Sequence, residues 1–492
     1  MPSFTARPAR PSALLLAVTI LGGAVAADAD AAIRFVNAGL TTGANDGSSW
    51  ENAYRGVGGL ATALAASVSG DEIWVVKGTY RPTTGTSRTV AFTLKSGVGI
   101  YGGFAGSERK REQRDPDANL TTLSGDLLGN DSGTANLTDN SYHVVVGSGA
   151  SATAILDGFT IRAGNANGAT ASNLDKGGGL IILNSGSPTI RRCTFTANRC
   201  TFGGGAVYIF TAGASFADCR FLSNVGGSFG GAFDMNNVVA GFDRCWFEGN
   251  TAARAGACES FGGSQTRYTN CVFTANTATG TNGGGALWIG TSSAVTARNS
   301  TFVGNSATQL AGGVRNTGGS STFSNCILWA NTGPGGTTSA NQISNGGGTT
   351  SVSYSTVQGG YTGSGNLSTD PKFADQAGRD FHLDAGSPAI DSGANATVTT
   401  GTTTDFDGAP RFVDDPTVAD TGAGTAPIVD RGAFERQASA CPSDLDGNGV
   451  VNAADLSLLL GSWGTAGVGD LDGNGTVNAA DLALLLGAWG GC

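Results

Sequence analysis

Two stretches near the C-terminal end of the chain have the residue types and the spacing of calcium-binding loops. Each follows the pattern D-x-D-x-N-G-x5-D, which places oxygen donors at loop positions 1, 3, 5, 7, 9 and 12. Ca²⁺ is a hard cation that takes roughly six to eight oxygen ligands, and a glycine at position 6 allows the sharp turn between them. The sequence therefore predicts two bound Ca²⁺ ions. The predicted ligands are Asp444, Asp446, Asn448, the carbonyl of Val450, Asn452 and Asp455 in the first loop, and Asp470, Asp472, Asn474, the carbonyl of Thr476, Asn478 and Asp481 in the second.

A second set of residues, in the middle of the chain, has the side chains that act on or bind sugars. Asp234 and Glu259 are candidate catalytic residues, because glycosidases use two carboxyl groups held roughly 5 to 9 Å apart. Tyr208 and Trp288 are candidate substrate-binding residues, because aromatic rings offer a large contact area at low entropic cost. The alternative interpretation is a solvated acidic pair beside exposed aromatic side chains.

An internal repeat between Ser187 and Asn331 brings these four residues together. The segment x-C-x-F-x-x-N returns in six copies, with successive steps of 26, 26, 26, 29 and 26 residues. A Gly-Gly-Ala type segment precedes each copy, and the short alternating apolar runs are typical of strands rather than helices. One such coil cannot bury its own apolar face, so the coils must stack about 4.8 Å apart in parallel pairing. We therefore predict an all-β fold, a right-handed parallel β-helix.

Stacking places equivalent residues of successive coils in columns. Phe195, Phe221, Phe247, Phe273, Phe302 and Leu328 are expected to form one apolar interior column, and Ile190, Phe216, Phe242, Tyr268 and Phe323 a second. The asparagines Asn198, Asn224, Asn250, Asn276, Asn305 and Asn331 are expected at turns, in left-handed backbone, with each amide bonded to the next copy. A solvent-facing column is expected to read Ile182, Tyr208, Asp234, Glu259, Trp288 and Asn316.

The Phe-x-x-Asn motif that alternates with Gly-Gly-Ala resembles the repeats of polymorphic outer-membrane proteins, within the pectin-lyase-like class of β-helices. The resemblance implies the fold and leaves the activity open. The Gly-His-Gly segment of polygalacturonases and the Arg-x-Pro-x-x-Arg signature of pectate lyases do not occur in this sequence. The only two histidines, His143 and His382, are isolated, and we expect both to be structural.

Each predicted calcium loop runs into a short apolar helix, and the duplicated loop-helix unit resembles a type I dockerin. Dockerins bind cohesin modules with helix residues that include loop positions 10 and 11. Here these positions hold Ala453, Ala454, Ala479 and Ala480, which departs from the family pattern, so the implied partner is a cohesin-like or another surface protein. Cys441 and Cys492 bracket the module and are predicted to form a disulfide that clamps a domain of about fifty residues.

The N-terminus has the pattern of a secretory signal peptide. Arg7 and Arg10 precede an apolar run over residues 13–26 that ends in Ala-Val-Ala. A membrane-spanning helix needs roughly 20 apolar residues, so no transmembrane segment is expected. The net charge of −10 argues against nucleic acid as a partner, because binding to phosphates needs clustered Lys and Arg. The cysteines of the repeat column are expected to pack as small interior side chains, since stacked residues point the same way; they are Cys193, Cys219, Cys245, Cys271 and Cys326. Cys200 and Cys258 lie off this column, and the sequence assigns them no role.

The predicted organisation is a signal peptide over 1–26, a β-helix with caps over 32–435, a linker over 436–440 and a dockerin-like calcium-binding domain over 441–492. A helix over 52–67 is expected to cover the first coil, and residues 370–435 to close the other end; the alternative for 370–435 is an independent small domain. The sequence favours a secreted or cell-surface protein that binds extracellular polysaccharide or acts in adhesion, displayed through the calcium module. A polysaccharide lyase or glycoside hydrolase and a structural surface protein are the alternatives, so whether the protein is an enzyme stays open.

Overall fold

The computed structural model describes residues 31–416, 418–437, 441–446 and 450–491. The predicted signal peptide, the predicted ligand Asn448 and the predicted disulfide partner Cys492 lie outside these residues. Within them, no helix is long and apolar enough to cross a membrane.

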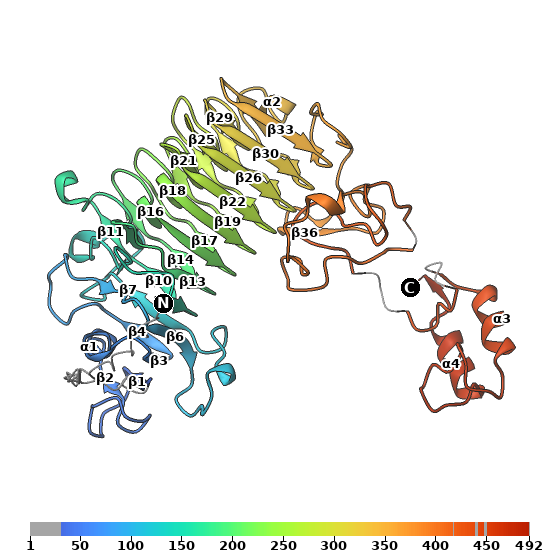
Figure 1. Cartoon of the computed structure of the whole chain (residues 1–492), viewed down its shortest axis with the longest axis horizontal. Helices are drawn as coiled ribbons and strands as arrows, with labels where there is room; N and C mark the ends of the chain where they lie inside the picture. The colour runs from blue at the N-terminus through green and yellow to red at the C-terminus, as the bar shows by residue number, and fades with distance from the viewer. Residues whose placement is uncertain (1–30, 417, 438–440, 447–449, 492) are drawn as a thin grey trace, which may run out of the picture.

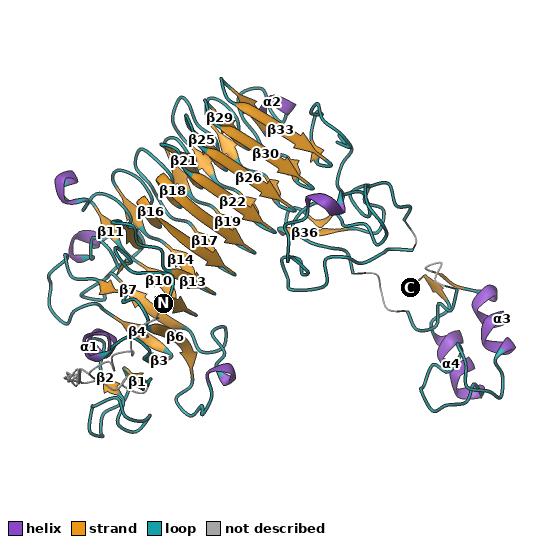
Figure 2. Ribbon diagram, viewed as in Figure 1, coloured by secondary structure: helices purple, strands orange, loops and turns teal. Residues whose placement is uncertain are grey.

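Short parallel strands stack into a right-handed β-helix with three faces (Figures 1 and 2). Face 1 contains β5 (Phe92–Thr93), β8 (Val145–Val146), β12 (Leu180–Ile182), β16 (Val207–Ala217), β18 (Phe233–Asp243), β21 (Cys258–Phe261), β25 (Leu287–Ile289), β29 (Val314–Asn316) and β32 (Ile343–Asn345). Face 2 contains β1 (Ile33–Asn37), β3 (Glu72–Val76), β6 (Gly99–Phe104), β9 (Ile155–Asp157), β13 (Thr189–Arg191), β16, β18, β22 (Gln265–Thr269), β26 (Ala294–Arg298), β30 (Ser320–Ser324) and β33 (Thr349–Ser353). The long strands β16 and β18 belong to both faces.

Face 3 contains β4 (Gly78–Tyr80), β7 (Thr121–Ser124), β10 (Thr160–Arg162), β14 (Thr194–Thr196), β17 (Arg220–Leu222), β19 (Trp246–Glu248), β23 (Val272–Thr274), β27 (Thr301–Val303), β31 (Ile327–Trp329) and β34 (Thr356–Val357). Shorter pairs lie between the faces: β2 (Tyr54–Arg55) beside β1, β11 (Asn165–Ala166) with β15 (Arg199–Cys200), and the row β20 (Thr251–Ala252), β24 (Thr277–Ala278) and β28 (Ser306–Ala307). Short helical turns interrupt the loops at η1 (Arg111–Gln113), η2 (Leu137–Asp139), η3 (Thr170–Ser172), α2 (Ser339–Gln342) and η4 (Asn395–Thr397).

Both predicted apolar columns are present. Along face 3 the phenylalanine column pairs coil by coil from Phe195 to Leu328, and its rings stack with centroids 4.4 to 5.1 Å apart. In the face 2 column, Ala297 takes the place between Tyr268 and Phe323. The five cysteines of the repeat column are buried free thiols, as expected from side chains that point the same way, and Cys200 and Cys258 are buried free thiols as well.

The asparagine column is fully buried and forms one continuous hydrogen-bond ladder. From Asn224 to Asn331, the Oδ1 of each asparagine accepts both the backbone N–H and the side-chain amide N–H of the asparagine one coil earlier, at 2.8 to 3.1 Å. Gln342 ends the ladder, because its Oε1 accepts from Asn331 Nδ2 at 2.7 Å. The expectation of left-handed backbone at the asparagines is wrong: positive φ falls one residue earlier, as at Ala197 and Ser223, so that the turn aims each asparagine inward.

The first coil is covered by α1 (Gly59–Ala66), which is shorter than the helix expected over 52–67 because Tyr54 and Arg55 pair as β2. Leu60, Ala63 and Leu64 of α1 are buried in the main core. At the other end, residues 358–367 turn over the last coil, where Leu367 O accepts from Val357 N at 2.9 Å and Tyr361 packs against the core.

Residues 370–435, which we call the strap, lie along the outside of face 3 instead of across the end of the solenoid. The hairpin β35 (Phe373–Asp375) and β36 (Asp380–Leu383) places Phe381 against Trp246, with ring centroids 5.8 Å apart. Further along, Val272 and Val303 of face 3 share a buried cluster with Ala433 and Phe434 of the strap. Face 3 therefore buries apolar side chains on both its inner and its outer surface in these coils.

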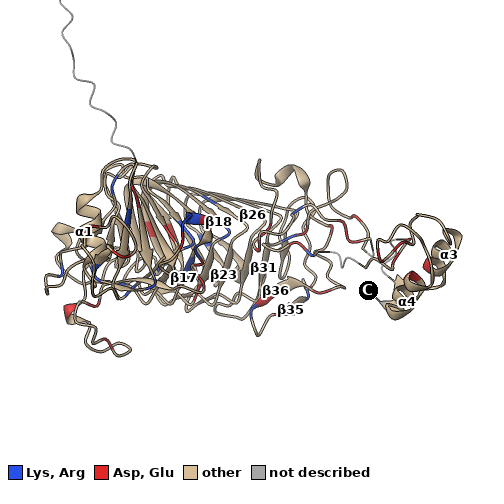
Figure 3. Cartoon of the chain, turned by 90° about the horizontal axis from the view of Figure 1, so that it is seen from below, with Lys and Arg blue, Asp and Glu red and all other residues tan. Residues whose placement is uncertain are grey.

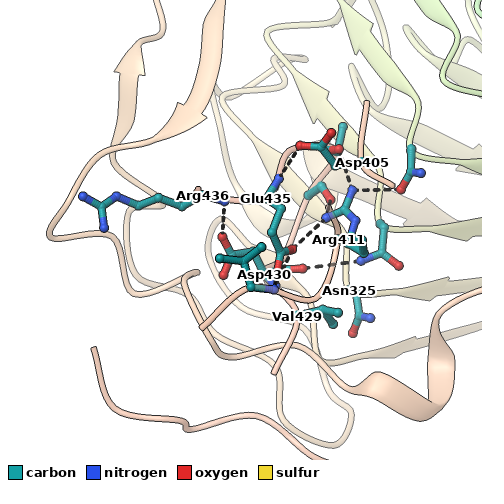
Figure 4. Close-up of polar contacts among 12 residues, drawn as sticks. Asn325, Asp405, Arg411, Val429, Asp430, Glu435 and Arg436 are labelled. Carbon is teal, nitrogen blue, oxygen red and sulfur yellow. Dashed lines mark hydrogen bonds and ion pairs between the residues drawn. The ribbon is translucent and has the colours of Figure 1, made fainter. Parts of the chain in front are cut away.

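Three asparagines of successive coils bind the strap directly. Each occupies the left-handed position before the cysteine column. Arg411, which is fully buried, donates to Asn270 Oδ1 at 2.8 Å and to the carbonyl of Ala433 at 2.6 Å, and Asn325 exchanges two hydrogen bonds with Ala394 (Figure 4). Asn299 donates more weakly, at 3.4 Å, to the carbonyl of Asp430.

The C-terminal module contains α3 (Ala453–Gly461), α4 (Ala479–Gly487) and an antiparallel pair of β37 (Val450–Val451) with β38 (Gly490–Gly491). Its small core consists of Val451, Leu459, Val477 and Leu485, which are related in pairs by the 26-residue repeat. Cys441 is disulfide-bonded, while the pairing with Cys492 stays a prediction.

Candidate functional site

Four of the six residues in the predicted outward column share one register on face 1. Tyr208, Asp234, Glu259 and Trp288 pair in that order across β16, β18, β21 and β25. The prediction was wrong at both ends, where the paired residues are Ile181 and Arg315 instead of Ile182 and Asn316. Because side chains alternate along a strand, a shift of one residue moves a position to the other surface of the sheet, and both predicted residues are fully buried.

The column does not face solvent, which corrects a second expectation. Asp234 is 5% exposed and Glu259 2%, and both aromatic members are buried as well. Side chains from the loops that precede these strands lie over them. Phe202 and Phe229 meet edge to face, with centroids 4.6 Å apart, and Arg254 follows from the next coil.

The covered column encloses a pocket of about 250 Å³. Its floor comes from alternate positions of face 1, and its walls come from the loops above them. The lining residues are Lys176, Phe202, Tyr208, Phe229, Asp234, Asn236, Arg254, Glu259 and Phe261. The structure thus brings Tyr208, Asp234 and Glu259 together, as predicted, in a pocket rather than on an open groove.

Burial raises the pKa of both carboxyl groups. Burial raises the pKa of Glu259 to about 8; the nearby Asp234 adds to the rise, and Arg254 opposes it. Burial also raises the pKa of Asp234 to about 7, against the opposing charges of Arg254 and Lys176. Glu259 Oε1 accepts from Arg254 Nη1 at 2.7 Å, whereas its Oε2 is buried without a hydrogen-bond partner among the described residues. The hydrogen-bonding capacity of the Glu259 carboxyl group is therefore only partly satisfied by the described residues.

Both cations of the pocket, Lys176 and Arg254, lie over aromatic rings. The Arg254 guanidinium lies 4.4 Å from the ring centroid of Phe229 and 4.5 Å from that of Trp288. Lys176 Nζ pairs with Asp175 at 2.7 Å and lies 4.6 Å from the Phe202 ring. Such contacts are worth roughly 0.5 to 2 kcal/mol each and restrict both cations.

Trp288 is the predicted residue that does not line the pocket. Its ring is covered by Arg254, and its Nε1 is buried without a partner among the described residues. The repeat pattern alone did not reveal Lys176, Phe202, Phe229 or Arg254, which come from loops. A usable signal existed, since a phenylalanine stands within two residues of the paired glycines in two successive coils.

The two histidines do not line this pocket. His143 is buried and bonds the carbonyl of Gly177 at 3.0 Å through Nδ1. His382 lies on the strap between Asp380 and Asp407, at 2.5 and 2.7 Å. Both contacts agree with the structural roles expected for them.

In the C-terminal module, the predicted calcium loops gather their carboxylates. Asp444, Asp446 and Asp455 each offer an oxygen within 4.8 Å of the others, and Asp470, Asp472 and Asp481 do the same. Acidic positions, red in Figure 3, lie in the loops beside α3 and α4. The donor set is all oxygen, which fits Ca²⁺.

The last aspartate of each loop is already oriented by the backbone. Asp481 accepts from Leu471 N at 2.7 Å, Asp472 N at 3.1 Å and Asn478 N at 2.8 Å. Although burial opposes the shift, these backbone hydrogen bonds lower the pKa of Asp481, and the equivalent bonds lower that of Asp455. Both groups are therefore ionised at neutral pH, as a calcium ligand must be.

A match to a protein-family model supports the fold. The family model described as "Right handed beta helix region" matches residues 128–302, less than half of the chain. Among solved structures, the crystal structure of pectate lyase Pel9A aligns with a TM-score of 0.42 and 18% identity, over 83% of this chain and 97% of that one. No curated protein matches the sequence.

Proposed function

We propose that the protein is a secreted or cell-surface protein that binds extracellular polysaccharide through the face 1 pocket. The observation that carries the proposal is the pairing of two buried carboxyl groups, Asp234 and Glu259, within an aromatic-walled cavity. Sugar hydroxyls donate and accept hydrogen bonds, while sugar rings pack their C–H faces on aromatic side chains. The pocket offers both kinds of contact in one place.

The size of the pocket favours one sugar ring as the bound unit. Its volume of about 250 Å³ lies just below the roughly 300 to 1,000 Å³ of sites for larger ligands. A ring in this space contacts the walls formed by Phe202 and Phe229 and lies beside the carboxyl pair. We therefore expect recognition of a chain end or a side branch, with the rest of the polysaccharide outside.

The C-terminal module would hold the protein at its place of action. We propose that its two loops bind two Ca²⁺ ions and that the folded module docks onto a cohesin-like or another surface protein. The two sets of clustered carboxylates support this proposal. Export through the predicted signal peptide would place the module where free calcium is plentiful.

A glycan array with the full chain tests the binding proposal. We expect the wild type to retain a defined set of glycans. Phe229→Ala should weaken retention at least tenfold, because it removes one wall of the pocket. Phe412→Ala, at an exposed phenylalanine of the strap, is the matched control and should bind as the wild type does. Absence of binding to any glycan, together with absence of cleavage, would leave the structural surface protein as the remaining reading.

Cleavage of polysaccharide is the second candidate function, and the raised pKa values of the carboxyl pair favour it. A glycosidase needs one protonated and one ionised carboxyl group at its working pH. Asp234 and Glu259 pair directly on neighbouring strands, which lie roughly 4.8 Å apart, close to the roughly 5 to 5.5 Å separation in retaining glycosidases. A lyase is the other form of this alternative and leaves an unsaturated product.

Two assays distinguish a glycoside hydrolase, a lyase and a binding protein. Reducing-sugar release without ultraviolet absorbance indicates hydrolysis, and release with absorbance of an unsaturated uronate indicates a lyase. Asp234→Asn and Glu259→Gln should abolish turnover in either enzyme, since a neutral amide cannot transfer the proton. In the binding reading both variants keep most of the affinity, because amides still hydrogen-bond to hydroxyls.

A further inference from the structure

The strap contains an acidic cluster that neither the pocket nor the C-terminal module uses. Asp391 is completely buried, and Asp414 and Asp420 are exposed. The three carboxyl groups each offer an oxygen within 4.8 Å of the others. They come from two segments that are more than twenty residues apart in the sequence, so the fold of the strap brings them together.

Asp391 has an unused oxygen in this cluster. Its Oδ2 accepts from Asp415 N at 3.2 Å, whereas its Oδ1 is buried and has no hydrogen-bond partner among the described residues. A buried carboxylate oxygen without a partner costs several kcal/mol, so native proteins rarely leave one unsatisfied. A hydrogen-bond donor or a bound cation can supply the missing partner.

Protein cations do not fill this role in the described part of the chain. Arg436 pairs with Asp415, and Arg411 pairs with Glu435 at 3.3 Å (Figure 4). No ion pair joins a Lys or Arg to Asp391, Asp414 or Asp420 in that part. A further carboxylate, Asp430, accepts from the backbone N–H of Asp391 at 2.7 Å and adds to the negative charge.

The backbone around the cluster is held in place. The carbonyl of Asp391 accepts from Thr421 N at 2.9 Å and from Gly422 N at 3.1 Å, which ties the segment after Asp420 to the buried turn that contains Asp391. Asp391 itself has a φ of 47°, in the left-handed region that non-glycine residues seldom adopt. Strained backbone of this kind persists only where surrounding contacts hold it in place, and such residues cluster at functional sites.

We propose that Asp391, Asp414 and Asp420 bind a calcium ion that fastens the 414–416 and 418–422 segments to the rest of the strap. The donors are carboxylate oxygens, which suit a hard divalent cation, and two exposed ligands leave room for the water molecules that complete a Ca²⁺ shell. The site lies close to the contact of Ala394 with Asn325, so the ion would also support the attachment of the strap to the β-helix. This calcium is separate from the ions proposed for the C-terminal module.

Counting bound calcium on the full chain tests the proposal. We expect equilibrium dialysis with radioactive calcium to show one ion fewer for the double variant Asp414→Asn, Asp420→Asn than for the wild type. Both positions are exposed, so neither change should prevent folding. Asp384→Asn, at another exposed aspartate of the strap, is the matched control and should leave the count unchanged. The difference of one ion is expected whether or not the C-terminal loops bind calcium.

Asp391→Asn gives a second and independent measurement. It should also remove one ion, and it should abolish the calcium-dependent protection of residues 414–422 from proteolysis, read by mass spectrometry of the fragments. If Asp391 is instead a neutral acid that holds its own proton, the calcium count stays at the wild-type value in both the double variant and Asp391→Asn. That result would overturn the proposal.

Discussion

At the scale of single residues, the carboxyl pair of face 1 is the feature that most affects stability and chemistry together. Asp234 and Glu259 were predicted on a solvated surface, where their pKa values would be ordinary. The loops of the preceding coils cover them instead, and the loss of solvent raises the pKa of both. Loss of solvent around the pair costs free energy, and hydrogen bonds to a bound ligand can offset part of this cost.

We predict that the stability of the β-helix falls as pH rises through the range of these two groups. The folded state keeps a proton on Asp234 up to pH of about 7, whereas the unfolded chain releases it near pH 4. Because the unfolded state then binds fewer protons, the free energy of unfolding decreases between these pH values, by at most about 1.4 kcal/mol per pH unit for each proton. Thermal unfolding from pH 4 to 9 measures the slope.

Asp234→Asn should flatten this slope and should be more stable than the wild type at pH 8, with little difference at pH 5. Asp384→Asn controls for a general change in net charge, since that aspartate is exposed. Equal slopes for Asp234→Asn and the wild type would mean that Asp234 is ionised in the folded protein across this range. Lys176 and Arg254, the cations that face the pair, would then outweigh its burial.

At the scale of an element, the asparagine ladder stabilises one turn in each of the six coils from Asn198 to Asn331. Each amide satisfies a backbone N–H that the left-handed turn before it removes from the strand pairing. The same amide donates to the carbonyl of a phenylalanine in the neighbouring coil, as Asn250 does to Phe221 at 2.8 Å. The ladder therefore supplies hydrogen-bond partners to the buried backbone polar groups of each of these sharp turns.

We predict that Asn250→Ala lowers the melting temperature by several degrees. The change leaves the backbone N–H and the side-chain amide of Asn224 without their acceptor, and each buried unsatisfied group costs roughly 1 to 3 kcal/mol. Asn345→Ala, at an exposed asparagine of β32, makes the same chemical change and should have little effect. Equal melting temperatures for the two variants would contradict a stabilising role for the ladder.

At the scale of the whole molecule, the strap joins parts of the chain that are more than a hundred residues apart. Arg411 is its central contact, because it is fully buried and bonds Asn270, Ala433, Gly432 and Glu435. Removal of one member of a buried ion pair costs roughly 3 to 5 kcal/mol, since the other charge remains without a partner. The strap should therefore depend on this residue more than on any single surface contact.

We predict that Arg411→Ala releases the strap while the β-helix stays folded. Limited proteolysis should then cut between residues 370 and 435 at least tenfold faster than in the wild type, with the far-ultraviolet strand signal preserved. Arg267→Ala, at an exposed arginine of β22, is the control and should be cut at the wild-type rate. Simultaneous loss of the strand signal would show instead that the strap and the solenoid unfold as one unit.

For the C-terminal module, we predict that removal of calcium unfolds it. Each loop brings three carboxylates together, and these repel one another when no cation is present. A chelator should expose residues 441–492 to protease, and added Ca²⁺ should restore protection, with the cleavage sites located by mass spectrometry. Equal protection with and without the chelator, also after reduction of disulfides, would contradict the prediction.

The interior of this protein followed from its sequence, because a fixed period forces equivalent residues into stacked columns. Phe195 to Leu328, the asparagine ladder and the five cysteines of the repeat column could be located by counting residues. At both ends of the predicted outward column the count was wrong by one residue, which misplaced Ile182 and Asn316. The identity of the calcium loops also rests on sequence spacing, and their occupancy stays a prediction.

The positions of the loop and strap residues outside the columns could be determined only from the tertiary structure. Loops of variable length carry Phe202, Phe229 and Arg254 over the carboxyl pair, and no periodicity specifies where such loops go. The strap likewise lies along the side of the solenoid and not across its end, because Trp246, Val272 and Val303 give the outside of face 3 an apolar surface where the strap docks. Strand repetition encodes local pairing, whereas these contacts depend on surfaces that exist only after the coils have stacked.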